Sequence, residues 1–163
     1  MTNANNELTI SRLLNAPRAS VWQAWSDSKY LVKCWCPSPG TTAVPGFDLQ
    51  PRYTFYTFMR GPDGDTSDNP GVFLEILPQE RIVFTSSLLA GWRPATPWLA
   101  MTAIITMEDE GSGTRYTARV LHKDEEDQRK HEEMGFHEGW GICIEQLGEL
   151  AQELARNSQV MRR

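Results

Sequence analysis

Residues 135–156 read GFHEGWGICIEQLGELAQELAR. The main apolar residues of this stretch are spaced by four, three, four, three and four positions: Phe136, Trp140, Cys143, Leu147, Leu150 and Leu154. This spacing places them on one face of an amphipathic α-helix. The charged residues from Glu125 onward also favour a helix, but one helix over 125–156 would be about 48 Å long, more than a domain of this size easily covers. The sequence therefore predicts a break near Gly135 and a long terminal helix over about 134–156.

Upstream of this helix, short runs of β-branched and aromatic residues predict strands. The first run lies near the N-terminus and six follow in the middle of the chain: 7–14, 47–50, 53–59, 72–77, 81–87, 99–108 and 114–121. Three stretches rich in Gly, Pro and acidic residues predict the turns: 61–65, 78–80 and 110–113. Because connections this short join antiparallel neighbours, we expect an antiparallel meander.

Two short helices are predicted between the first strand and the others. Pro17 presets the backbone for a first helical turn, and Val21 and Trp25 recur at helical spacing, which indicates a helix over 17–26 and a second over 29–34. The order of elements is typical of an α+β domain. We expect a helix-grip fold, in which a curved antiparallel sheet wraps around the long C-terminal helix and leaves a cavity between them.

Length and charge restrict the classes of partner. At 163 residues the chain is long enough for one domain, whose core we place at about 8–156 with polar tails at both ends. The net charge of −5 disfavours nucleic acid or an anionic membrane as the main partner. The chain contains no run of 18 apolar residues and no signal-peptide pattern, and its three cysteines favour a reducing compartment. We therefore expect a cytoplasmic protein.

Several groups of residues, in order along the chain, resemble the activator of heat-shock protein 90 ATPase homologue-like family of the START-like superfamily. They are Ala16-Pro17-Arg18 with Val21-Trp22 and Ala24-Trp25, Trp35-x-Pro37, Asp48-Leu49-x-Pro51, Met59 with Pro62-Asp63-Gly64, Gly71 with Glu75-Ile76 and Glu80-Arg81-Ile82-Val83-Phe84, and Gly135-Phe136 with Gly139-Trp140. The resemblance extends over about 8–154. It implies a single START-like domain with a deep apolar cavity, which in this superfamily holds lipids, polyketides or hormones and in a minority of members supports catalysis. Where relatives commonly have Pro-Gly-Gly, this chain has Pro51-Arg52-Tyr53.

Large apolar residues, together with one glycine, are the candidates for contact with a ligand in that cavity: Trp35, Met59, Phe73, Phe84, Trp92, Trp98, Met101, Met134, Gly135 and Trp140. Each of these side chains could instead belong to the core, as such residues usually do. Trp92 and Trp98 flank the loop 93–97, which could gate an entrance or be pinned at the surface by its rings. The helix glycines Gly135, Gly139 and Gly141 could leave cavity volume, or could serve close packing or the helix break.

Four residues are candidates for a general acid or base inside the cavity: Glu75, Arg119, His122 and His137. A structural ion pair is the favoured interpretation of Glu75. His131 and His137 are six residues apart and so point to different sides of a helix, which indicates solvated residues rather than a metal site. Cys34 and Cys36 lack the spacing of a metal or redox pair, and 63–68 is interpreted as a hairpin turn. We predict no catalytic residue, metal or cofactor.

The leading hypothesis is a non-enzymatic protein that binds a small hydrophobic molecule between the sheet and the terminal helix. A cavity-based enzyme acting on an apolar substrate as a cyclase, dehydratase or hydrolase is the second. The third is a co-chaperone-like interaction module with a role in the stress response, which follows from the resemblance. A contact with a chaperone and a homodimer both stay open as partners.

Overall fold

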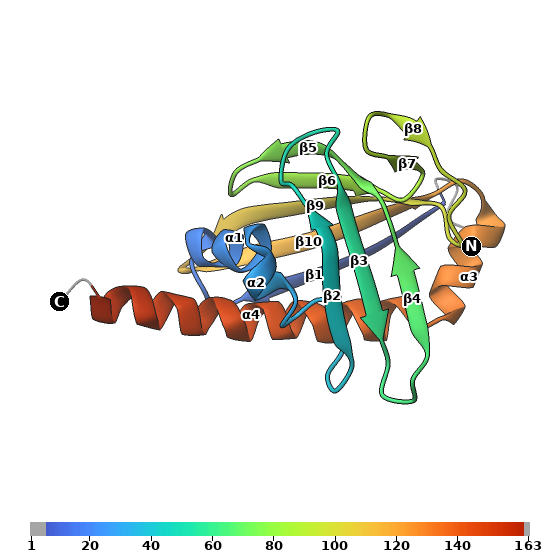
Figure 1. Ribbon diagram of the computed structural model, residues 1–163. Helices are drawn as coiled ribbons and strands as arrows, with labels where there is room; N and C mark the ends of the chain where they lie inside the picture. Colours follow the sequence, from blue (N-terminus) through green and yellow to red (C-terminus); the bar gives the residue numbers. More distant parts are fainter. Residues whose placement is uncertain (1–5, 162–163) are drawn as a thin grey trace.

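The computed structural model describes residues 6–161. Over these residues the chain forms the following elements: β1 (Glu7–Leu14), α1 (Arg18–Ser26), α2 (Ser28–Leu31), β2 (Thr41–Phe47), β3 (Phe55–Arg60), β4 (Thr66–Asn69), β5 (Val72–Leu77), β6 (Arg81–Thr85), β7 (Leu88–Leu89), β8 (Arg93–Pro94), β9 (Met101–Glu110), β10 (Gly113–His122), α3 (Glu125–Glu133) and α4 (Phe136–Met161). This is the α+β order predicted above (Figure 1).

The strands form a main sheet, a small sheet and a hairpin. The main sheet has five antiparallel strands in the order β1-β10-β9-β6-β5. The small sheet has the order β2-β3-β4, and β7 pairs with β8. A single bridge between Thr54 and Val72 connects the start of β3 to β5. The antiparallel pairing is as expected, but the strands do not form one meander, because β4 and β5 belong to different sheets.

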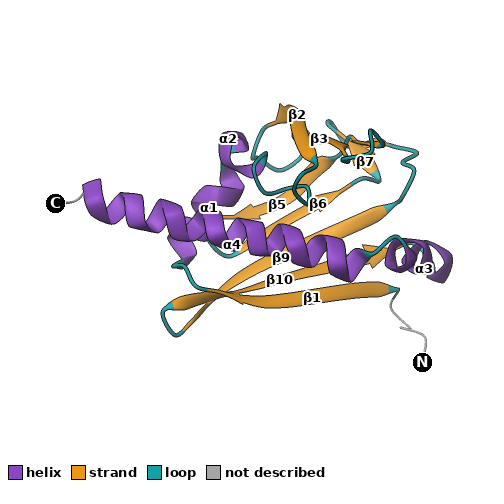
Figure 2. Ribbon diagram, turned by 90° about the horizontal axis from the view of Figure 1, so that it is seen from below, coloured by secondary structure: helices purple, strands orange, loops and turns teal. Residues whose placement is uncertain are grey.

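The main sheet curves over α4, with β1 on one flank of the helix and the small sheet on the other (Figures 1 and 2). The helix directs an apolar stripe into the core: Phe136, Ile144, Leu147, Ala151 and Leu154 are buried. Its backbone runs closest to α1 and β1 rather than to the small sheet. The predicted helix-grip architecture is therefore confirmed. No helix in the described part of the chain is long and apolar enough to cross a membrane.

The predicted helix break is present. Gly135 has a φ of 93°, and its N–H donates to the carbonyl of Glu132 at 3.1 Å, between the end of α3 and the start of α4. A residue with a side chain rarely adopts such a φ. Helix α4 continues to Met161, beyond the predicted end at residue 156.

Some predicted boundaries were wrong. The strand predicted at 47–50 lies earlier in the chain, because β2 is Thr41–Phe47. This strand accommodates Pro45 through a register shift between Ala43 and Gly46. The second short helix is Ser28–Leu31 rather than 29–34.

Two segments predicted as a turn and a loop also contain strands. The end of the predicted turn 63–68 belongs to β4, and the predicted loop 93–97 begins with β8. Apart from Thr66, their residues have low strand propensity, so pairing with β3 and β7 determines their conformation.

Two glycines test the role of the break. A Cβ added at Gly135 or at Gly139 would meet no atom within 4 Å, so the two sites differ mainly in backbone conformation. We expect Gly135→Ala to lower the free energy of unfolding by about 1–3 kcal/mol because of its left-handed φ. Gly139→Ala should raise it by up to about 1 kcal/mol because alanine favours the helix. Urea unfolding followed by circular dichroism measures the free energy of unfolding of both variants. Equal changes in the two variants would contradict the role of Gly135 as the helix break.

Candidate functional site

The aromatic residues near the centre pack against one another. Trp25 and Phe73 are fully buried, and their ring centroids are 6.1 Å apart. Phe55 stacks on Phe73 at 4.7 Å and meets Phe84 at 4.9 Å, while Trp35 lies 5.4 Å from Phe55. Phe73 and Phe84, both candidates for ligand contact, are thus core residues held by other rings. The interior around them is filled.

The small sheet has a different inner side. Phe55, Thr57 and Met59 alternate along β3 with residues that face outward, and Phe55 belongs to the core, so this side faces the interior. Register pairs Met59 with Thr42 on β2 and Ser67 on β4, and pairs Thr57 with Asn69. Residues directly opposite each other share a face. We call Thr42, Met59, Ser67 and Asn69 the inner-face cluster; all four are half-buried.

Within this cluster the hydroxyl of Thr42 has no hydrogen-bond partner, although its oxygen is buried. Ser67 and Asn69 do have partners, because the Asn69 amide donates to Ser67 Oγ at 2.9 Å. A buried polar atom without a partner costs about 1–3 kcal/mol. The Thr42 hydroxyl is therefore a polar group whose hydrogen-bonding capacity is unused.

The flank of α4 beside Trp140 is open at Gly139, where an added Cβ would meet nothing within 4 Å. Further along α4, the chain is tied to the segment that follows α2. Cys143 Sγ donates to the Trp35 carbonyl at 3.4 Å, and the Gln146 amide donates to the Cys36 carbonyl at 2.9 Å. Open space thus remains on the first turns of α4, while the later turns are closed by these contacts.

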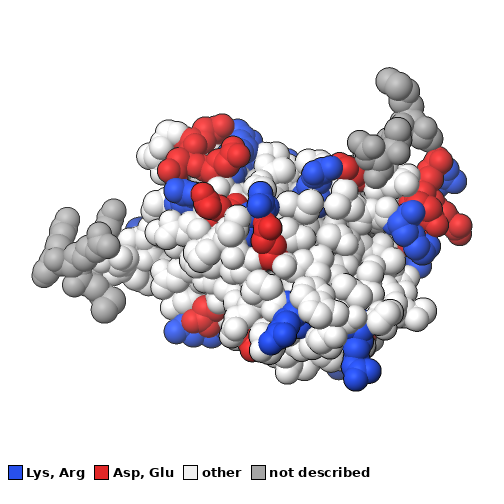
Figure 3. Space-filling view, turned by 90° about the horizontal axis from the view of Figure 1, so that it is seen from above, with Lys and Arg blue, Asp and Glu red and all other residues white. Residues whose placement is uncertain are grey.

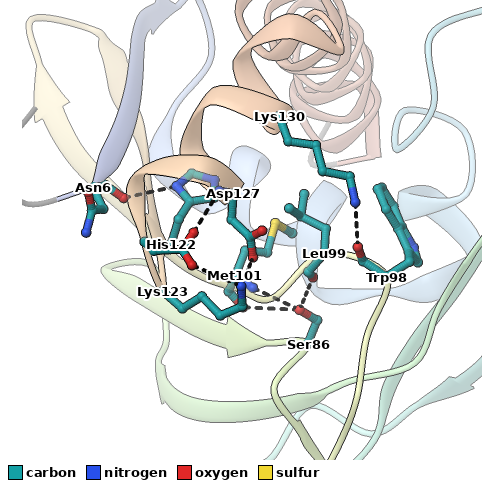
Figure 4. Close-up of polar contacts among 10 residues, drawn as sticks. Asn6, Ser86, Trp98, Leu99, Met101, His122, Lys123, Asp127 and Lys130 are labelled. Carbon is teal, nitrogen blue, oxygen red and sulfur yellow. Dashed lines mark hydrogen bonds and ion pairs between the residues drawn. The ribbon is translucent and has the colours of Figure 1, made fainter. Parts of the chain in front are cut away.

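The segment around Trp98 connects α3 to the small sheet. The indole N–H of Trp98 donates to Asn69 Oδ1 at 3.1 Å. Lys130 Nζ donates to the Trp98 carbonyl at 2.9 Å and lies 5.7 Å from the centre of its ring (Figure 4). Ser86 Oγ donates to the Leu99 carbonyl at 2.8 Å and accepts the Met101 N–H at 3.0 Å. The loop is thus pinned at three points beside the inner-face cluster.

Two histidines meet where α3 packs on β10. His122 Nε2 lies 2.9 Å from His131 Nδ1, and both residues are buried. The interpretation of His131 as solvated was therefore wrong; the charged run around it concealed its inward position. Burial, and then the proximity of His122, lower the pKa of His131 to about 4. His137, in contrast, is exposed as expected.

The other candidate acids and bases lie on the outside. Glu75 forms an ion pair with Arg81, and about 43% of the Glu75 side chain is exposed. Arg119 pairs with Glu7, with Nη2 and Oε1 2.6 Å apart. The structural interpretation of Glu75 agrees with its pairing, although the pair is not buried. Of the four candidates only His122 reaches the interior.

The cysteines are free thiols. Burial raises the pKa of both Cys34 and Cys143 to about 12, so both are protonated at neutral pH. Within residues 6–161, no group of three or more His, Cys, Asp and Glu side chains is arranged to hold a metal ion.

The structure does not bring the ten predicted contact residues together. Met59 belongs to the inner-face cluster, and Trp98 is hydrogen-bonded to Asn69 of that cluster. Met101 lies opposite His122 on β9, Trp140 packs against Phe136 of α4, and Trp35 lies between Phe55 and α4. Trp92 projects half-exposed from the β7–β8 hairpin. Met134 and Gly135 form the junction of α3 and α4, where the Met134 side chain is 54% exposed.

Sequence reasoning missed the polar members of the inner-face cluster, Thr42, Ser67 and Asn69, and the buried His131 outside it. Thr42, Ser67 and Asn69 are brought to one face by pairing between strands, a long-range property that no local pattern indicates.

Two shallow surface grooves lie elsewhere. One of about 390 Å³ borders Arg18, Arg81 and Asp109, and another of about 420 Å³ lies on the exposed side of α3 beside Arg129 and Met134. Over the face seen in Figure 3, most atoms belong to uncharged residues, and many acidic and basic groups lie next to each other. Charge therefore does not mark a single dominant surface there.

The comparisons with known proteins give one family model and several similar solved structures. The family model described as Activator of Hsp90 ATPase homolog 1-like protein matches residues 15–152. The chain is similar to protein NE0264 from Nitrosomonas europaea, with 40% identity, a TM-score of 0.86, and 93% of this chain and 97% of that one covered. It is also similar to protein Ms6760 from Mycobacterium smegmatis, with 26% identity, a TM-score of 0.78, and 90% of each chain covered. No curated protein matches the chain.

The Thr42 hydroxyl provides a test of the site. We expect Thr42→Val, which keeps the shape but removes the unpartnered oxygen, to raise the free energy of unfolding by about 1 kcal/mol. Thr41→Val, on the adjacent exposed position of β2, should change it by less than about 0.5 kcal/mol. Urea unfolding measures both variants. A clear loss of stability in Thr42→Val would show that the hydroxyl already has a partner.

Proposed function

The chain belongs to the family of Activator of Hsp90 ATPase homolog 1-like proteins, and from this premise we propose that it binds a small, uncharged and mainly apolar molecule between the inner-face cluster and the first turns of α4. The apolar part of the ligand would lie against Met59 and Trp140. Its polar group would reach the inner-face cluster, beneath the loop that contains Trp98.

The observation that carries the proposal is the unpartnered hydroxyl of Thr42, which lies on the face of the small sheet that is turned toward the interior. A ligand that hydrogen-bonds this oxygen would remove the cost of leaving it unpaired. The space beside Gly139, where an added Cβ would meet no atom within 4 Å, leaves this part of α4 accessible to a ligand. Ligand sites are commonly built in this way, from apolar walls with a few polar groups that orient the molecule.

The residues of the site also restrict the ligand's charge. The inner-face cluster offers hydroxyl, amide and thioether groups, but no ionisable one. Lys130 lies nearby, and its ammonium group is already bound to the Trp98 carbonyl and faces that ring. A charged ligand would lose its hydration without gaining an ion pair, which is costly. A neutral molecule with one hydroxyl, carbonyl or ether group fits these partners best.

The family description favours a second candidate, a contact with Hsp90 that alters its ATPase rate. The two functions are distinguished by adding the chain to purified Hsp90 and measuring ATP hydrolysis. Stimulation without ligand binding would favour the second candidate over the first.

Binding of N-phenyl-1-naphthylamine, a neutral apolar fluorophore, tests the ligand site. We expect saturable binding to the native chain and at least about tenfold weaker binding to Gly139→Leu, because the leucine side chain would occupy the open flank of α4. Glu149→Leu is the matched control, since it adds the same side chain on the exposed side of the same helix. Absence of saturable binding, or equal binding by all three proteins, would reject the proposal.

A further inference from the structure

Helix α3 is held to the rest of the domain by very little apolar surface. His131 is its one buried residue, and the remaining side chains of Glu125–Glu133 are exposed or half-buried. His131 contacts His122 of β10 and lies against two rings of α4, Phe136 at 5.0 Å and Trp140 at 6.1 Å. Figure 4 shows His122 beside Asn6. The packing of α3 therefore depends on a histidine pair.

The hydrogen bonds determine where the protons of the neutral pair lie. His122 Nδ1 is 3.0 Å from the backbone carbonyl of Asn6, which can only accept, so this nitrogen carries the hydrogen. His122 Nε2 is then an acceptor in the neutral ring, and His131 Nδ1 must donate to it. His131 Nε2 is left as the basic nitrogen of the pair.

Adding a proton therefore places a positive charge on His131, among the rings of Phe136 and Trp140. A second proton, on His122 Nε2, would leave two donors facing each other and would break the bond between the rings. Burial disfavours even the first of these charges, which is why the pKa of His131 is lowered to about 4. In a state with α3 released, the ring regains water and its ordinary pKa near 6.5.

The charged groups around the pair have partners of their own. On the β10–α3 side, Lys123 pairs with Asp124 and with Asp127. On β1, Glu7 pairs with Arg119.

Among residues 6–161, the other neighbours named here provide no counter-ion. On β9, Met101 lies opposite His122 and is uncharged. On α4, His137 is exposed beside Phe136. Burial and His122 are the causes that lower the pKa of His131.

Lys130 links this pair to the proposed ligand site. It precedes His131 and holds the Trp98 carbonyl, while the Trp98 indole is bound to Asn69 of the inner-face cluster. If α3 moves away, the Trp98 loop loses its hydrogen bond to Lys130 and keeps the one to Asn69 of β4.

The geometry points to an acid-sensitive latch: protonation of the His122–His131 pair releases α3 and, through Lys130, loosens the Trp98 loop beside the inner-face cluster. Its effect on ligand access rests on the proposed function, whereas the release of α3 does not. The sign follows from proton linkage. Between about pH 6.5 and pH 4 the released state binds more protons than the closed one, so opening is favoured by up to about tenfold for each pH unit lost.

Hydrogen–deuterium exchange of the α3 amides tests the latch without a ligand. After correction for intrinsic exchange rates, we expect α3 protection in the native chain to fall by about fifty- to hundredfold between pH 7.5 and pH 4.5, with β9 protection as the internal reference. His131→Gln, which cannot titrate, should change by less than about threefold over the same range. His137→Gln, at an exposed position, should behave as the native chain.

The slope with pH, rather than the absolute protection, is the readout, so a variant that loosens α3 at every pH still gives an answer. Constant α3 protection in the native chain, or the same slope in His131→Gln, would overturn the latch. Association rates of N-phenyl-1-naphthylamine test the second step: they should rise on acidification in the native chain, and already at pH 7.5 in Lys130→Met. No binding at any pH would reject the ligand site, and a pH-independent rate would reject the loosening of the loop.

Discussion

The fold depends on the burial of one indole ring. Trp25 of α1 is fully buried and lies within about 5.5–6.2 Å of the rings of Trp35, Phe55, Phe73 and Phe84. These rings come from the segment after α2, from β3 of the small sheet, and from β5 and β6 of the main sheet. A buried indole needs a partner for its N–H, and Tyr116 of β10 provides one at 3.0 Å. One side chain thus joins the first helix to both sheets, and its position determines where the small sheet can be attached.

That attachment explains why the candidate site lies where it does. The small sheet is fixed at Phe55 and at the nearby Phe47, whose ring lies 5.8 Å from that of Phe55. Beyond these rings β2, β3 and β4 run across the flank of α4 (Figure 1), while the helix backbone lies closest to α1 and β1. The inner side of the small sheet can therefore carry Thr42, Ser67 and Asn69, which a filled core would not tolerate without complete pairing. The interior thus has two parts, one packed with aromatic rings and the other, the inner-face cluster, half-buried and mainly polar.

The sequence predicted those elements whose residues follow a local periodicity or end at a turn residue. The stripe of α4, the break at Gly135 and most strands of the main sheet follow from spacing and turn residues that act within a few positions. The small sheet was only partly predictable, because β4 has the composition of a turn and becomes a strand by pairing with β3. The predicted contact residues were selected by size, so the selection included Phe73 and Phe84, whose neighbours are supplied by distant parts of the chain. His131 was hidden for a similar reason: it lies among charged residues, and only its contact with His122 shows that it points inward.

The two terminal helices differ in how their attachment is distributed. Helix α4 is attached by apolar contacts along much of its length, because it buries Phe136, Ile144, Leu147, Ala151 and Leu154. Helix α3 concentrates its attachment in His131, a residue whose pKa is near 6.5 in water and is lowered to about 4 by burial. Gly135 lies between the two helices, and its left-handed conformation interrupts the helical hydrogen bonding, so α3 and α4 are separate helices. Acid can therefore act on α3 while α4 stays in place, and the nearest structure that depends on α3 is the Trp98 loop, through the single hydrogen bond of Lys130.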